Sequence, residues 1–170
     1  MPLLDWIGKA TAVNHHRQVP YRLLLCDLSL SVGNADTGNL LVQGDNLLAL
    51  KALLPYYAGK VKCIYIDPPY NTGAAFEEYD DGMEHSLWLS MMYPRIELLW
   101  EFLTEDGSLW VSLDDNEAHY FKVICDEILG RSNFIADIAW KKRDGPPNDR
   151  VIGAVHEHVL VVSVAPGTPG

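Results

Sequence analysis

The strongest constraint on how this chain folds is the apolar run VKCIYID at residues 61–67, which ends at a double proline. A nearly continuous apolar run of this length is typical of a strand that is covered on both faces of a parallel sheet. Pro68 and Pro69 lack an amide hydrogen, so neither residue can continue a ladder of strand hydrogen bonds. The sequence therefore predicts a buried strand that stops at Asp67.

Strand-like and helix-like stretches alternate on both sides of this run. Strands are expected at residues 40–44, 61–67, 107–114, 134–142 and 158–165, and helices at 46–57, 86–103 and 116–129. Pro94 lies inside the second helix and predicts a kink or two abutting helices. This alternation indicates an α/β fold with a doubly wound, mostly parallel sheet. Because no helix separates the last two strands, we expect them to pair antiparallel.

Three of the predicted strands end at an aspartate: Asp45, Asp67 and Asp114. Ligands of doubly wound sheets bind just beyond the carboxyl ends of the strands, so these residues are candidates for a site. Asp45 could equally cap the helix that follows it, by accepting from its free amide groups. Asp114 and Asp115 could line a pocket, and they could also cap the helix at 116–129.

Residues 67–70, Asp-Pro-Pro-Tyr, combine groups that suit a planar amine. An ionised Asp67 only accepts hydrogen bonds, and the prolines leave rigidly aimed carbonyl oxygens beside it. Two such acceptors match the two protons of an exocyclic –NH2 group, and Tyr70 offers a flat face for stacking. The pattern favours a site for adenine or cytosine, although a plain strand-ending turn is the alternative reading of two prolines.

Composition limits the class of protein. With 170 residues, 48% of them hydrophobic and 21% charged, the chain fits one domain or one incomplete domain. A net charge of −10 argues against a dedicated nucleic-acid binder, because phosphates are neutralised by Lys and Arg. The basic triplet at 141–143 is more typical of a solvated strand edge, and the acidic loop at 76–81 is either a lid or a solvated loop.

Cysteine usage and hydropathy favour a cytoplasmic protein. The three cysteines are isolated and form no CxxC pair, which is typical of reduced thiols. No apolar run approaches the roughly 18–20 residues that cross a membrane.

Two long stretches resemble the amino-methylating DNA methyltransferases: LLVQGDNLLALKALLPYYAGKVKCIYIDPPYNTG and WLSMMYPRIELLWEFLTEDGSLWVSLDDNEAHYFKVICDEILG. The resemblance covers residues 39–165 and is closest to the modification subunit of type III restriction-modification systems. The combination of GDN, DPPYNTG, MMYPR and SLDDNE is far more specific than DPPY alone.

This resemblance implies a fold of the S-adenosylmethionine-dependent methyltransferase type and methylation of adenine N6 in double-stranded DNA. Asp67 and the Pro68 carbonyl would accept from the N6 amine, Pro69 would rigidify the turn, and Tyr70 would stack on a flipped-out base. Asp in the first motif position favours adenine by resemblance, and the chemistry of the acceptors leaves cytosine N4 open. A non-catalytic, truncated modification subunit is a further alternative.

The resemblance also implies a cofactor and partners. Asp45, Asn46 and Asp67 would contact S-adenosylmethionine, and the full-length protein would form a homodimer and bind a restriction (helicase–nuclease) subunit. Methyl transfer from a sulfonium needs no metal, so no metal site is expected, although the HEH spacing at 156–158 would suit one. We expect an N-terminal leader at 1–39 and the catalytic-motif part at 40–170, without the glycine-rich FxGxG cofactor loop and the target-recognition domain.

Overall fold

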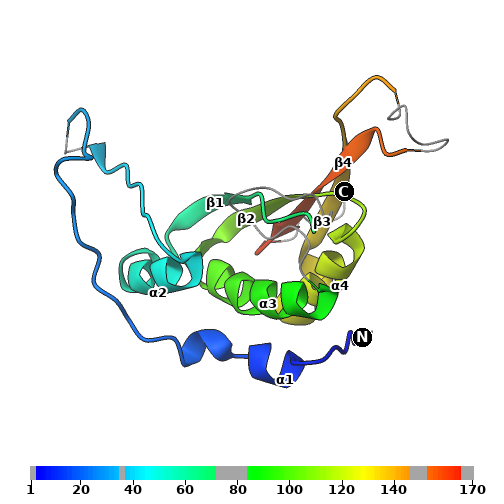
Figure 1. Cartoon of the computed structure of the whole chain (residues 1–170), viewed down its shortest axis with the longest axis horizontal. Helices are drawn as coiled ribbons and strands as arrows, with labels where there is room; N and C mark the ends of the chain where they lie inside the picture. The colour runs from blue at the N-terminus through cyan, green and yellow to red at the C-terminus, as the bar shows by residue number, and fades with distance from the viewer. Residues whose placement is uncertain (1–2, 35–36, 72–83, 146–152, 166–170) are drawn as a thin grey trace.

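The computed structural model describes residues 3–34, 37–71, 84–145 and 153–165. Helices and 3-10 turns occupy α1 (Lys9–Ala12), η1 (His15–Arg17), α2 (Asn46–Tyr57), α3 (His85–Phe102), α4 (Ala118–Leu129) and η3 (Arg131–Asn133). Strands occupy β1 (Val61–Ile66), β2 (Leu103–Leu113), β3 (Phe134–Lys141) and β4 (His156–Ser163). The strands form one sheet in the order β1-β2-β4-β3 (Figure 1).

The sheet is mixed, with a single reversed strand. β1 pairs parallel with β2, while β4 pairs antiparallel with both β2 and β3. Strands β1, β2 and β3 therefore point the same way, and only β4 runs against them. This confirms the predicted α/β class and the antiparallel last pair, in a mixed sheet of which β1 and β2 form the parallel part.

The three long helices lie on one face of the sheet (Figure 1). Leu109 and Val111 of β2 are fully buried in a core that also contains Trp88, Ile96 and Phe121 from the helices. On the opposite face, Tyr65 of β1 is 61% exposed, whereas Val161 of β4 is buried. The expectation that the strand at 61–67 is covered on both faces is therefore wrong for the residues described.

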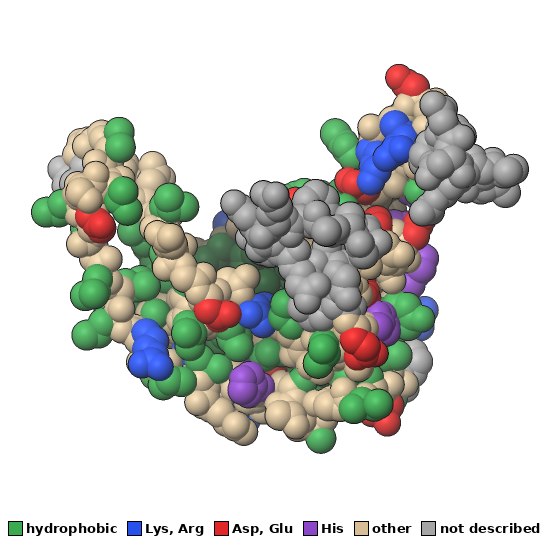
Figure 2. Space-filling view, in the orientation of Figure 1, with side chains coloured by type: hydrophobic (Ala, Val, Ile, Leu, Met, Phe, Trp, Pro, Cys, Tyr) green, Lys and Arg blue, Asp and Glu red, His purple; other side chains and the backbone are tan. Residues whose placement is uncertain are grey.

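The strand predicted at 40–44 is also wrong, because these residues form no strand. Leu41 is fully exposed and Leu40 is 63% exposed. They belong to an extended arm, residues 20–44 without the undescribed 35–36, whose apolar side chains reach the surface (Figure 2). An apolar run of five residues forms a strand only beside a partner strand, and no described strand pairs with this one.

One helix and one strand also differ in extent from what the sequence predicts. α3 is one uninterrupted helix that includes Pro94, in place of two abutting helices. The turns on both sides of Pro94 are anchored in the core by Met92 and Ile96, which compensates for the missing amide hydrogen. β2 begins at Leu103, directly after α3, whereas the strand was expected from residue 107.

The N-terminal segment packs under the helices. The Trp6 Nε1 group donates to the Ser90 hydroxyl at 2.8 Å, and Lys9 forms an ion pair with Glu127 at 2.7 Å. These contacts hold α1 against α3 and α4. No helix in the described ranges is long and apolar enough to cross a membrane.

Candidate active site

The residues Asp67, Pro68, Pro69 and Tyr70 follow β1 directly, at the carboxyl edge of the parallel strands. Asp67 is exposed, whereas the prolines and Tyr70 are half-buried. This is the edge at which sheets of this type bind ligands. The structure thus places the predicted base-binding residues together, in one turn.

Trp88 of α3 engages one of the two proline carbonyls of the turn. Its side chain is fully buried, and its Nε1 group donates to the Pro69 carbonyl at 2.8 Å. No hydrogen bond from a described residue ends at the Pro68 carbonyl. The Asp67 carboxylate, which interacts with the Tyr70 hydroxyl, and the Pro68 carbonyl are the acceptors of the turn that Trp88 does not engage, and we call them the acceptor pair.

A buried carboxylate holds the other side of the turn. Asn71 has a left-handed backbone, with φ of 59°, and its Nδ2 group donates to Glu117 Oε1 at 2.7 Å. His85 Nδ1 lies 2.9 Å from the same oxygen. Glu117 is only 1% exposed, and a buried carboxylate needs such partners. The turn is thereby tied to the start of α4 as well as to α3.

Tyr70 carries a neutral phenol. Burial raises its pKa, and the negative charges of Asp67 and Glu157 raise it further. The hydroxyl lies 3.5 Å from Glu157 Oε2 on β4. An uncharged aromatic ring held at its hydroxyl end is suited to stacking on a planar heterocycle.

The predicted cofactor residues Asp45 and Asn46 occupy the start of α2. Asp45 Oδ1 accepts from the amides of Leu47 and Leu48 at 2.9 and 3.1 Å, which confirms the predicted helix cap. Arg95 donates from Nε to Asn46 Oδ1 at 2.6 Å, and its Nη2 lies 3.5 Å from Asp45 Oδ2. The Asp45 side chain remains 54% exposed, so part of the carboxylate faces solvent.

The two aspartates after β2 do not cap α4, contrary to one of the two expectations for them. α4 begins at Ala118, and Glu117 takes the N-cap position without a side-chain capping bond. Asp114 Oδ1 accepts instead from the Asn116 amide at 3.0 Å. Burial raises the pKa of Asp114, against the effect of its bonds to Asn116. The Asp115 side chain instead contacts His158, whose Nε2 lies 2.9 Å from Asp115 Oδ1.

The basic triplet at 141–143 is partly neutralised by neighbours. Lys141 pairs with Asp144 at 2.5 Å, and Lys142 pairs with Glu157 at 2.7 Å. These ion pairs agree with the interpretation of a strand edge. The acidic loop at 76–81 lies outside the residues that the structure describes, as do the last two residues of DPPYNTG.

Sequence reasoning missed Trp88, Glu117 and His85 as parts of this site. Glu117 lies in the SLDDNE stretch, and Trp88 lies just before MMYPR, so the motifs pointed to the right segments. Nothing in the motifs could pair Trp88 with Pro69 or Glu117 with Asn71. Those pairs join residues 19 and 46 positions apart and exist only because α3 and α4 pack beside β1.

Comparison with known protein families places part of the chain in a described family. A family described as DNA methylase, N6_N4_Mtase, matches residues 61–166. This range contains β1 to β4 and the Asp67–Tyr70 turn.

Curated relatives are similar to the chain over most of its length. The Mod subunit of the type III restriction-modification enzyme EcoP15I from Escherichia coli is 35% identical, over 93% of this chain and 29% of that protein. The EcoPI Mod subunit of Escherichia phage P1 is 36% identical, over 79% of this chain and 26% of that protein. The chain thus spans under a third of the length of these relatives.

Solved structures support the fold. TTHA0409 of Thermus thermophilus, assigned as a DNA modification methylase, matches with a TM-score of 0.51 and 17% identity, over 72% of this chain and 53% of that one. The same protein complexed with S-adenosyl-L-methionine matches with a TM-score of 0.50 and 18% identity, over 71% and 51%.

Proposed function

The chain belongs to the family of N6/N4 DNA methylases, and on this premise we propose that it carries the base-binding part of an adenine-N6 DNA methyltransferase. The observation that carries the proposal is the acceptor pair of Asp67 and Pro68, in a turn that Trp88 holds through the neighbouring Pro69 carbonyl. Similarity to type III Mod subunits supports an adenine target in double-stranded DNA and a role in restriction-modification.

The acceptor pair acts on the amine of the target base. Its two N–H bonds donate to the Asp67 carboxylate and the Pro68 carbonyl, which orients the nitrogen lone pair away from both acceptors. Tyr70 stacks on the ring of the base. A base inside a duplex cannot reach this turn, so the target nucleotide leaves the helix first.

Rigid support of the turn is what makes this arrangement useful. Trp88 and Glu117 hold Pro69 and Asn71 from inside the core, so the acceptors need no rearrangement when the base arrives. Preorganised polar groups of this kind contribute more than groups that must reorient during the reaction.

S-adenosylmethionine supplies an electrophilic methyl group when it is bound. Asp45, Asn46 and Asp67 are the residues proposed to hold it. The exposed part of the Asp45 carboxylate fits a hydrogen-bond donor of the cofactor, while its other oxygen caps α2. We further propose a cytoplasmic location, a restriction subunit as partner and self-association, in line with the systems to which the relatives belong.

The decisive experiment compares Asp67→Ala with Asp144→Ala in the protein at its full natural length. Asp144 is an exposed aspartate outside the turn, with a side chain that is 97% accessible. Tritiated methyl transfer to double-stranded DNA should be lost in Asp67→Ala and unchanged in Asp144→Ala, and binding to DNA should persist in both. Mass spectrometry of the digested DNA identifies the methylated base.

Each outcome has a clear meaning. N6-methyladenine supports the proposal, and N4-methylcytosine would replace it with the cytosine alternative. Retained transfer in Asp67→Ala would remove the assigned role of that carboxylate. Calorimetry on the 170-residue chain with millimolar S-adenosylmethionine addresses stand-alone function, because absent binding there would exclude catalysis by this chain alone.

A further inference from the structure

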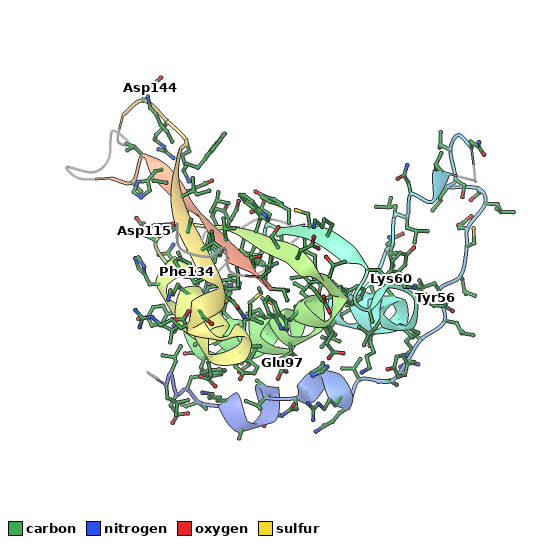
Figure 3. All side chains as sticks on the ribbon, turned by 180° about the vertical axis from the view of Figure 1, so that it is seen from behind. Tyr56, Lys60, Glu97, Asp115, Phe134 and Asp144 are labelled. Atoms are coloured by element: carbon green, nitrogen blue, oxygen red, sulfur yellow. The ribbon has the colours of Figure 1, made fainter. Side chains whose placement is uncertain are left out.

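A second group of polar side chains lies beyond the Asp67 turn, where β2 ends and β4 begins. It consists of Asp115, His156 and His158, each of which offers one ligand atom within 4.8 Å of the others. Figure 3 labels Asp115, next to the β3–β4 strand pair. The two histidines are two positions apart on β4, so their side chains project from the same face of the strand. Their ring centroids are 5.2 Å apart.

We propose that Asp115, His156 and His158 bind a divalent transition-metal ion, with zinc as the representative case. Two imidazole nitrogens and one carboxylate oxygen are a donor set that suits Zn²⁺, Co²⁺ or Ni²⁺. Mg²⁺ and Ca²⁺ prefer sites built from oxygen ligands alone. Three protein ligands leave a further position for water.

Asp137 gives the strongest support for this site. His158 Nδ1 lies 2.9 and 3.0 Å from the two Asp137 oxygens, while Nε2 lies 2.9 Å from Asp115 Oδ1. A carboxylate that accepts from one ring nitrogen of a histidine fixes the tautomer and raises the basicity of the other nitrogen. This leaves Nε2 of His158, which lies 2.9 Å from Asp115 Oδ1, as the nitrogen that would coordinate the metal ion. The residues thus provide both the ligands and the group that orients one of them.

The cation would join three elements that are distant in the sequence. Asp115 follows β2, Asp137 lies on β3, and both histidines lie on β4. Glu157, between the histidines, projects to the opposite face, where it contacts Lys142 and the Tyr70 hydroxyl. A cation bound here would therefore fix the start of β4. Because Glu157 lies in this part of β4 and contacts the Tyr70 hydroxyl, the cation would also help to position Tyr70, for either target base.

Protons compete with the metal for this site. Burial lowers the pKa of His158, but its hydrogen bonds to Asp115 and Asp137 outweigh that effect and raise it above 6.5. The other titratable groups around the ring are His119, at 5.5 Å between ring centroids, and His156. Metal affinity should increase as the pH rises, because an imidazole nitrogen must lose its proton before it coordinates a metal ion.

The test is calorimetric titration of Zn²⁺ into the 170-residue chain, after removal of metals with a chelator. We expect saturable one-to-one binding at micromolar concentration, and no saturation with Mg²⁺. His156→Gln and Asp115→Asn should abolish this binding, and Asp137→Asn should weaken it by about 10–100-fold. His15→Gln, which removes a histidine from η1, is the matched control and should bind as the unchanged chain does.

Replacing Zn²⁺ with Co²⁺ gives a spectroscopic measurement that is independent of calorimetry and of enzymatic activity. Coordination by two histidines should give visible absorption bands that disappear in His156→Gln. Absence of saturable Zn²⁺ binding, or binding that is unchanged in both His156→Gln and Asp115→Asn, would overturn the proposal. Asp115 is an exposed side chain, so its substitution leaves the core intact and gives an independent second variant.

Discussion

Two aspartates of this chain, Asp67 and Asp45, were both expected to end strands and to hold ligands, and their surroundings differ greatly. The turn after Asp67 is held from inside by Trp88 and Glu117, which are 0% and 1% exposed. Asp45 follows no strand and caps an exposed helix start. The first aspartate belongs to a turn fixed by tertiary contacts, whereas the second depends on its sequence neighbours.

The difference has a physical origin in burial. A buried polar group without a partner costs free energy, so the indole of Trp88 and the carboxylate of Glu117 permit few alternative positions of the turn. At an exposed helix start, water can replace any lost partner. The proposed base-binding half is therefore rigid in the described structure, and the residues proposed to contact the cofactor lie on a surface that water reaches.

The substitution with the largest expected effect on this comparison is Trp88→Ala. Removing a fully buried indole leaves a cavity and should lower the free energy of unfolding by about 3–5 kcal/mol. Leu41→Ala in the extended arm should change it by less than about 0.5 kcal/mol, because Leu41 is fully exposed. Urea denaturation followed by circular dichroism measures both. Equal effects of the two variants would contradict the contrast.

A narrower substitution, Trp88→Phe, separates packing from hydrogen bonding. It keeps most of the ring volume but removes the donor to the Pro69 carbonyl. An unsatisfied buried carbonyl should lower the free energy of unfolding by about 1–3 kcal/mol. In the methylation assay the variant should lose activity with little change in DNA binding, since the turn loses its support. A variant as stable and as active as the original would show that this bond does not hold the turn.

Apart from the Leu41→Ala control, the smallest expected effect is that of Asp45→Ala. Loss of a helix cap should lower the free energy of unfolding by about 0.5–2 kcal/mol. Asp45→Asn keeps an oxygen that can accept from Leu47 and Leu48, so it should retain most of the stability. The same two variants probe cofactor contact, because a role for the carboxylate charge predicts weaker S-adenosylmethionine binding in both. Normal binding in Asp45→Asn would restrict this residue to capping.

Much of the fold could be predicted because several signals were local. The cap at Asp45 and the helix at 46–57 depend on neighbouring residues, the strand at 61–67 was indicated by its own apolar run, and all three are present in the structure. The strand expected at 40–44 failed because strand formation requires a partner elsewhere in the chain. Continuity of α3 through Pro94 likewise depended on core packing that no local rule expresses.

The sequence by itself determined the chemistry of the turn: a carboxylate, two prolines that fix rigid carbonyls and an aromatic ring, placed where an apolar strand ends. Tertiary structure decided how those groups are used. Trp88 donates to the Pro69 carbonyl, and Glu117 accepts from Asn71, which lies 46 residues away in the sequence. Local residue types set which groups a segment offers, but only packing between distant segments decides which of them are already bonded.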